Sequence, residues 1–331
     1  MDFKETIGID VSKPFIDAVI HSNQKHRQFR NSSKGFKDLL SWVKKQSNHK
    51  ASNRLFAFEH TGLYSAPLSI FLTKEEVAYI MIPGLELKKS MGIVRGKTDK
   101  VDAKTIALYT YRRRDEVKPY ILPSEKLLIL RKLLSLRDKL VKQSSAYKAT
   151  NKEIKDFMNK ENNEIYFEIH DEMISILNEK IKKVEKQIKT IIKTEEKLHE
   201  QYKLITTIKG VGDQTAWHMI VYTNAFTLFD NSRKFASYSG VAPFPYQSGI
   251  SIKGKSKVHQ FANKKFKSLL SNCASSAVMH NSELRLYYTN RLELGKNKMS
   301  TLNIIRNKIL SRIFAVIQRG TPYVDTYAFA S

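Results

Sequence analysis

The chain has 331 residues, enough for two or three domains, and its 57 Lys and Arg outnumber its 32 Asp and Glu to give a formal net charge of +25. This excess favours a polyanionic partner, above all nucleic acid. The single cysteine, Cys273, excludes an internal disulfide and a cysteine zinc site, and the absence of a long apolar run or a signal peptide predicts a cytoplasmic protein without a membrane span.

The first third of the chain alternates short apolar strands with amphipathic helices. The predicted elements are strands over residues 6–13, 15–22 and 25–31, a helix over 32–46, a strand over 54–62, a helix over 66–75, a strand over 77–83, and helices over 85–94 and 98–113. This order, with one acidic residue on the first strand and one on the fourth, is typical of an RNase H-like (RuvC-like) α/β domain.

Four carboxylates stand at positions that such a domain would use. Asp10 lies on the first strand and Glu59 ends the fourth, while Asp99 and Asp102 lie three residues apart on one face of a helix. Clustered carboxylates bind Mg²⁺ or Mn²⁺ through oxygen, and two such ions can polarise a phosphodiester. Taken singly, each acid is equally well explained as a turn residue, a strand-end charge or part of a solvated helix face.

The middle of the chain, residues 119–203, has few strand signals and predicts a helical spacer. One long basic helix is expected over 124–158, a turn over 159–168, and a second helix over 171–205 with an apolar heptad pattern typical of a coiled coil. The seam consists of Ile174, Leu177, Ile181, Val184, Ile188, Ile191 and Leu198, with Glu195 as its polar break. This seam would pair either with the preceding helix or with another subunit.

Residues 204–331 form a mainly helical third region. A helix end, a Gly210-Val211-Gly212 turn and a new helix match a helix-hairpin-helix, in which backbone N–H groups approach a phosphate, although a plain interhelical turn has the same pattern. A Pro/Ser/Gly-rich loop then carries Ser248, with Ser251 close by, and a run of lysines. The expected nucleic-acid contacts are Lys209, Gly210, Gly212, Lys253, Lys255, Lys257, Lys264 and Lys265. A serine in a polar loop is more often structural than catalytic.

Together these parts resemble the DEDD transposases of the insertion-sequence-110 family, which are related to Piv-type DNA invertases. The motifs GIDVSK, FEHTG and KTDKVDAKTIA look like the family's four-acid domain, and TIKGVGDQTA followed by FASYSGVAPFPYQSG looks like its C-terminal transposase domain. The resemblance implies three regions: a DEDD nuclease domain over 1–118, a helical domain over 119–203 and a transposase domain over 204–331.

The resemblance also implies the roles of single residues. Asp10, Glu59, Asp99 and Asp102 would be the metal-binding acids, with Mg²⁺ or Mn²⁺ as the cofactor. The serine before glycine, Ser248, would be the nucleophile. Many relatives read Ser-Gly-Gly at this point, whereas this chain reads Gln-Ser-Gly-Ile-Ser, which leaves Ser251 as a lesser candidate.

The resemblance further implies that the protein acts as a dimer or tetramer. It also implies a structured bridge RNA that pairs with donor and target DNA. The function expected from the sequence is therefore metal-dependent, serine-mediated DNA cleavage and strand exchange. The alternatives are a Holliday-junction-type nuclease that uses the acids and water, and a non-catalytic nucleic-acid-binding protein with an inert nuclease fold.

Overall fold

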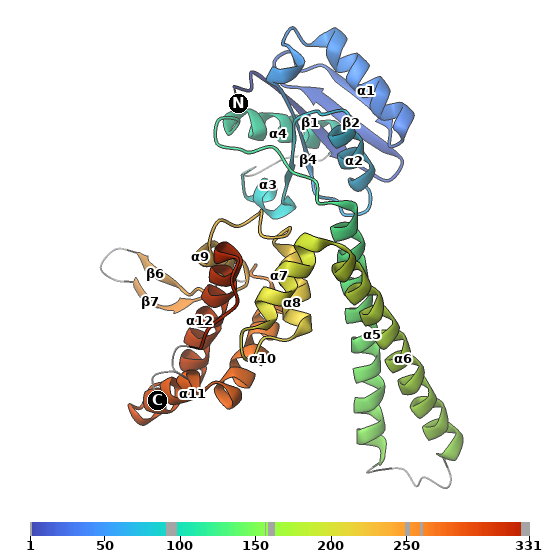
Figure 1. The fold of residues 1–331 in the computed structure, drawn as a ribbon. Coiled ribbons are helices and arrows are strands. Elements are labelled where there is room, and N and C mark those ends of the chain that lie inside the picture. Colours follow the sequence, from blue (N-terminus) through green and yellow to red (C-terminus); the bar gives the residue numbers. More distant parts are fainter. Residues whose placement is uncertain are drawn as a thin grey trace. The chain divides into compact units, whose positions relative to one another are not determined.

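The computed structural model describes residues 2–90, 98–155, 157, 163–248, 252–258 and 261–325, and its course is drawn in Figure 1. The chain forms two compact units, Met1–Leu122 and Pro123–Ser331. The division into three domains that the sequence suggests stays a prediction. No helix within the described ranges is long and apolar enough to cross a membrane.

A mixed five-stranded sheet forms the centre of the first unit, in the order β3-β2-β1-β4-β5. Its strands are β1 (Glu5–Val11), β2 (Phe15–Ile20), β3 (His26–Arg30), β4 (Arg54–Glu59) and β5 (Tyr79–Ile82). Strands β1, β2 and β3 form an antiparallel meander, whereas β1, β4 and β5 run parallel. The first and fourth strands are therefore neighbours, as the expected RNase H-like order requires.

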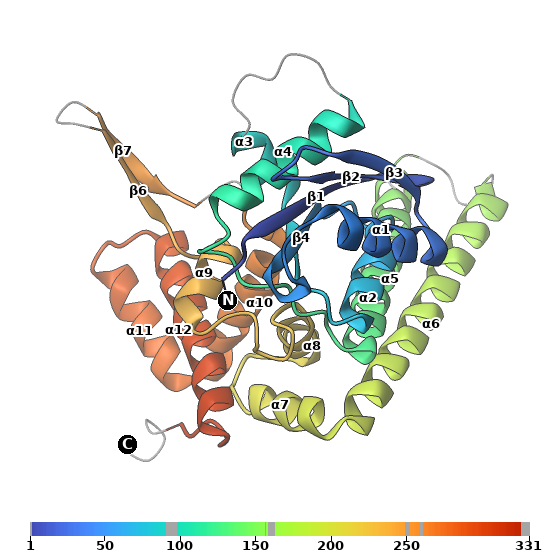
Figure 2. The same cartoon turned by 90° about the horizontal axis from the view of Figure 1, so that it is seen from above.

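Helices cover both faces of this sheet. Helices α1 (Ser33–Gln46) and α2 (Ala66–Lys74) lie on one face, and α4 (Asp99–Arg112) lies on the other, with the short α3 (Gly84–Ser90) after β5 (Figure 2). Alternate side chains of each strand point to opposite faces. Ile7 and Ile9 of β1 join the core under α1 and α2, so the residues between them face α4.

The second unit begins with two long helices, α5 (Glu125–Lys155) and α6 (Glu164–Thr194), which pack side by side as a helical hairpin (Figure 1). Of the predicted seam, Leu177, Val184 and Ile188 are buried within this one chain. Polar pairs add to the contact, since Arg137 donates to Glu185 at 2.7 Å and Ser144 to Asn178 at 3.1 Å. The intramolecular pairing is thus present, and pairing with another subunit stays a prediction.

The predicted single helix over 171–205 is wrong at Glu195. This residue has an extended backbone, with φ −107° and ψ 104°, which ends α6 and allows a separate helix α7 (Glu196–Thr206) to start in a new direction. The helix also begins earlier than expected, at Glu164. The heptad pattern continues past Glu195 because the spacing of apolar residues is unaffected by one residue with an extended backbone.

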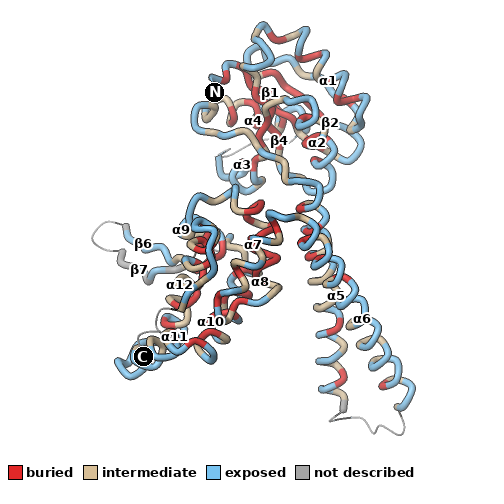
Figure 3. Tube along the Cα trace, in the orientation of Figure 1, coloured by how far each residue is buried: buried red, intermediate tan, exposed pale blue. Residues whose placement is uncertain are grey.

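The remaining helices surround one apolar core that includes Trp217, Phe235 and Phe266. They are α8 (Asp213–Tyr222), α9 (Ser232–Tyr238), α10 (Lys264–His280), α11 (Ser282–Glu293) and α12 (Lys298–Arg319). Between α9 and α10, where the sequence predicts a loop, the chain forms a two-stranded hairpin of β6 (Phe244–Ser248) and β7 (Ile252–Lys257). The described hairpin residues are largely exposed, in contrast to the mostly buried β1, β2 and β4 of the first unit (Figure 3).

Candidate active site

Asp10 and Glu59 lie near the ends of two adjacent parallel strands. The register pairs Ile9 of β1 with Phe58 of β4, so each acid is the next residue along its own strand. Phe58 faces the core under α1 and α2, and the alternation of side chains therefore directs Glu59 to the opposite face. Asp10 follows Ile9 by the same rule, and both acids lie on the face that α4 covers.

Helix α4 approaches β1 closely because both carry small residues at the contact. A Cβ added to Gly8 would lie 2.2 Å from the carbonyl oxygen of Ala103 and 2.2 Å from the amide nitrogen of Ala107. The Thr6 hydroxyl donates to the Ala107 carbonyl at 2.9 Å, which fixes the helix along the strand. This contact brings the first turn of α4 towards the strand end that carries Asp10.

The first turn of α4 holds the other two acids. The Thr98 side chain caps the helix by accepting a hydrogen bond from the Val101 amide at 3.3 Å. Asp99 and Asp102 follow within that turn, where the unpaired N–H groups of a helix favour negative charge. Asp99 is exposed and Asp102 is half-buried.

The negative charges of the neighbouring acids affect the pKa of Asp10. Burial raises the pKa of its carboxyl, and the negative charges of Asp102, Asp99, Asp17 and Glu59 raise it further, to about 6 from an ordinary value of 3.8. Such an effect requires the carboxylates to be near one another, since a charge exposed to water acts over a short range. The acids expected from the sequence therefore form one electrostatic cluster.

The cluster includes a fifth acid that the sequence analysis missed. Asp17 of β2 pairs in register with Asp10, and its carboxylate is buried. Its oxygens contact His26 Nε2 at 2.7 Å and accept from Gln28 Nε2 at 3.0 Å. Because these partners on β3 already engage it, Asp17 is a neighbour of the site and contributes negative field to it. The alternation of side chains along the predicted meander was the sequence signal that could have identified it.

A glycine makes room for Glu59. A Cβ added to Gly84 would lie 2.0 Å from Glu59 Oε1, so the carboxylate rests directly over the start of α3. The register pairs Glu59 with Ile82 of β5, two residues before this glycine. Nothing local in the sequence marks Gly84, because its role depends on a parallel strand pairing.

The residues fit a hard divalent cation in their chemistry. All donors are carboxylate oxygens, and none of the four acids forms an ion pair with a described Lys, Arg or His. In the described part of the chain, no three His, Cys, Asp or Glu side chains lie close enough together to bind one metal ion. The raised pKa of Asp10 shows negative charge that a cation would compensate.

Ser248 lies at the end of β6, paired in register with Ile252 of β7. Ser251 and the other residues between them lie outside the described ranges. Lys253, Lys255 and Lys257 lie on β7. The serine and these lysines are therefore on one hairpin: Ser248 and Lys253 lie next to its turn, whereas Lys257 pairs in register with Phe244 at the opposite end.

Of the expected nucleic-acid contacts outside the hairpin, two lysines form ion pairs within the protein. Lys209 pairs with Asp325 at 3.1 Å and Lys265 with Asp138 at 2.6 Å, whereas Lys264 is exposed. Gly210 has φ +92°, and a Cβ there would lie 2.8 Å from the Ala277 amide of α10. Gly212 lies in the same turn and is the N-cap of α8. Binding of phosphate by this turn stays a prediction.

Two family models match the chain. Residues 7–158 match a model of DEDD transposases of the IS110 type, described as a transposase. Residues 202–289 match a model described as the transposase IS116/IS110/IS902 family. The first match contains the four acids, and the second contains the α7–α8 turn and the serine hairpin.

Two curated relatives are similar over nearly the whole length, and a third over part of it. The pilin gene-inverting proteins of Moraxella bovis and Moraxella lacunata are each 29% identical, over 97% of this chain and 98% of their own. An uncharacterized 43.6 kDa protein of the insertion element IS110 from Streptomyces coelicolor is 27% identical over 45% of this chain and 36% of its own.

Proposed function

The chain belongs to the IS110 family of DEDD transposases, enzymes that act on DNA, and we propose that it cuts and rejoins DNA strands with its acid cluster and Ser248. The observation that carries the proposal is the convergence of negative charge from β1, β4 and α4 on Asp10. A cluster of this kind is unfavourable for a fold without a cation. The cluster is therefore best explained by a bound cation that takes part in catalysis.

In this proposal Asp10, Glu59, Asp99 and Asp102 hold Mg²⁺ or Mn²⁺. When bound, the ion would withdraw charge from a phosphodiester and so favour attack at phosphorus. The acids orient the bound group from a rigid sheet edge and from a capped helix turn. Asp10 must lose its proton to bind a cation, and its raised pKa of about 6 makes this step sensitive to mild acid.

Ser248 is the proposed nucleophile. Its Oγ forms a bond to phosphorus while one P–O bond of the DNA strand breaks, and the serine proton passes to the leaving oxygen to give a free hydroxyl end. The reverse step with a new hydroxyl restores a phosphodiester and the serine, so no external energy source is required. The neighbouring Lys253, which pairs in register with Gln247, lies on the same hairpin and would favour a phosphate.

The rearrangement itself is transposition or inversion. The relatives named pilin gene-inverting proteins match nearly the whole chain, and the same cutting and rejoining chemistry serves either outcome. We further propose a structured bridge RNA and a dimer or tetramer as partners, from the family resemblance and the net charge of +25. A non-coding segment of the host element complementary to both DNA partners would support the RNA.

The proposal is tested by changing Asp102 to Asn in the full chain and measuring strand cleavage and recombinant product with Mg²⁺. Loss of a metal ligand should lower the rate by more than about 100-fold while the thermal unfolding curve stays close to that of the wild type. The matched control is Asp38→Asn, an exposed acid on α1, which should leave the rate unchanged. Full activity of Asp102→Asn would refute the metal site, and cleavage without a protein–DNA adduct would favour the structure-specific nuclease.

A further inference from the structure

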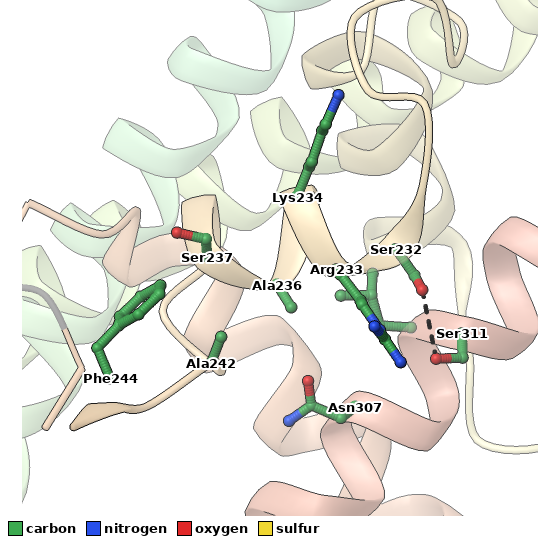
Figure 4. A pocket seen from close by; sticks show the side chains of 10 residues that line it. Ser232, Arg233, Lys234, Ala236, Ser237, Ala242, Phe244, Asn307 and Ser311 are labelled. Carbon is green, nitrogen blue, oxygen red and sulfur yellow. Dashed lines mark hydrogen bonds between the residues drawn. The ribbon is translucent and has the colours of Figure 1, made fainter. Parts of the chain in front are cut away.

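Two adjoining cavities lie at the foot of the β6–β7 hairpin. One has a volume of about 480 Å³ and is lined by residues of α9, α12 and β6 (Figure 4). The second, of about 400 Å³, lies between α9, β6 and the segment that precedes α10. Both are lined by Ser237 and Phe244, so these residues form a wall between them. Volumes of this size are typical of pockets that take small-molecule-sized groups.

Aromatic rings dominate the second cavity. Phe244 is 48% exposed, Phe261 49% and Tyr238 37%. Three large aromatic side chains around one hollow are unusual on a surface with so many charges. Exposed rings of this kind are the platforms on which unpaired bases stack.

Positive charge lies in the first cavity. The Arg233 guanidinium points into it towards Asn307, whereas Lys234 points away (Figure 4) and hydrogen-bonds Asp230. No described acidic side chain pairs with Arg233. One residue before Asn307, Arg306 is 5% exposed, and its only described partner is the Asn303 side chain at 3.3 Å. Arg233 therefore adds positive potential to this cavity, while Arg306 is buried beside it and does not line it.

The remaining lining combines mostly apolar surface with a few polar groups. Ser232 and Ser311 lie 3.4 Å apart at one side of Arg233, and Asn307 donates to the Val241 carbonyl at 2.9 Å. No acidic residue lines either cavity. An apolar protein partner would leave the arginine and the hydroxyl groups without compensation, whereas a nucleotide offers a ring for Phe244 and a phosphate for Arg233.

We propose that the foot of the β6–β7 hairpin binds unpaired nucleotides, with Phe244 stacked on a base and Arg233 on the adjoining phosphate. A base within a duplex has both faces covered by its neighbours, so the site selects single strands. Ser248 is four residues along β6 from Phe244, roughly 14 Å at the rise of an antiparallel strand. This proposal rests on the proposed function, because it states which form of nucleic acid is held beside the reacting Ser248.

The test is equilibrium binding of the full chain to a short fluorescein-labelled oligothymidine and to a blunt duplex of the same length, with EDTA present. Phe244→Ala should weaken single-strand binding by about 5- to 100-fold and change duplex binding by less than about twofold. Phe244→Trp, which keeps a stacking ring, should bind like the wild type. Arg233→Gln should also weaken single-strand binding, whereas Lys234→Gln should not.

The aromatic control is Phe157→Ala, an 86% exposed ring beyond the end of α5, which should leave both affinities unchanged. An equal effect of Phe244→Ala on single strand and duplex, or no effect on either, would overturn the site. An equal loss in Phe157→Ala, or no rescue by Phe244→Trp, would do the same. Thermal unfolding of each variant checks that the hairpin change has not unfolded the helical core.

The same measurement with oligouridine identifies the strand. Similar losses for both oligonucleotides mean that the pocket recognises a base and a phosphate alone, while a loss confined to one assigns the site to DNA or to RNA. Because EDTA prevents metal-dependent chemistry, the binding result is independent of the acid cluster. Asp102→Asn should bind the oligonucleotide like the wild type, which separates a failure of this inference from a failure of the proposed function.

Discussion

The two regions that carry the proposed chemistry are built in opposite ways. The acids stand on a five-stranded sheet with packed helices on both faces, and Gly8 allows α4 to lie against β1. Ser248 stands on a two-stranded hairpin whose described side chains are mostly exposed. A hairpin of two strands has little stability of its own in water.

The difference follows from charge. Carboxylates that repel one another spread apart unless a rigid scaffold holds them, and the raised pKa of Asp10 records that repulsion. A serine hydroxyl is neutral until it reacts, so its support does not have to resist such a force. The comparison predicts that a change at the half-buried Asp10 alters both stability and chemistry, whereas a change at the serine alters chemistry alone.

The largest expected effect is that of Ser248→Ala. Removing the proposed nucleophile should lower covalent adduct and recombinant product by more than about a thousandfold, while the unfolding temperature stays unchanged. Denaturing gels of a stalled reaction and mass spectrometry of the linked peptide measure the adduct. Ser251→Ala is the control and should keep its activity. An adduct mapped to Ser251 would show that the other serine reacts.

The variant Gly8→Ala tests whether the close packing of α4 on β1 holds the acids in place. The new methyl group would meet backbone atoms of Ala103 and Ala107 at 2.2 Å, and backbone cannot move aside without shifting the whole of α4. We expect a loss of about 1–3 kcal/mol in the free energy of unfolding, together with weaker cleavage because Asp99 and Asp102 move with the helix. Denaturant titration of the full chain measures it. An unchanged midpoint would mean that the close contact is not needed.

Gly84→Ala should separate chemistry from stability on the same scaffold. Here the methyl group would meet the Glu59 side chain at 2.0 Å, and a flexible side chain can turn away. The free energy of unfolding should change by less than about 0.5 kcal/mol, because the contact lies at a partly exposed helix start and involves only the end of a flexible side chain. Cleavage should fall by roughly 10- to 100-fold, as for a lost positioning contact beside a metal ligand. Equal cleavage by the wild type and by Gly84→Ala would show that Gly84 does not help to position Glu59.

The sequence predicts the acid-bearing sheet more completely than it predicts the serine hairpin. Asp10 and Glu59 were found because local alternation and strand order place them on adjacent strands, and their metal-binding role stays a prediction. Asp17 was missed because its pairing with Asp10 depends on the register of the β1–β2 hairpin, and Gly84 because its role depends on a parallel strand pairing between segments distant in the sequence. The hairpin was missed because Pro243, Pro245 and Gly249 favour a loop, and pairing across the turn overrode that local preference.

The smallest expected effect concerns Asp10 without metal. Its pKa is raised by burial and by the neighbouring acids from 3.8 to about 6, so the folded protein holds this proton more tightly than the unfolded chain. The resulting stabilisation is complete below pH 3.8 and is lost as pH rises through about 6. Above that pH, an ionised Asp10 destabilises the metal-free fold.

Asp10→Asn should therefore abolish cleavage and yet raise the stability of the metal-free protein at neutral pH. After allowance for solvent screening of a half-buried group, we expect a gain on the order of 1 kcal/mol in EDTA above pH 6, fading towards zero near pH 3.8. Thermal unfolding across this pH range measures the difference. Added Mg²⁺ should stabilise the wild type more than the variant, because binding to the folded state adds to its stability. An Asp10→Asn protein that is less stable than the wild type at neutral pH in EDTA would show that the acids do not repel, and would remove the physical basis for a shared cation site.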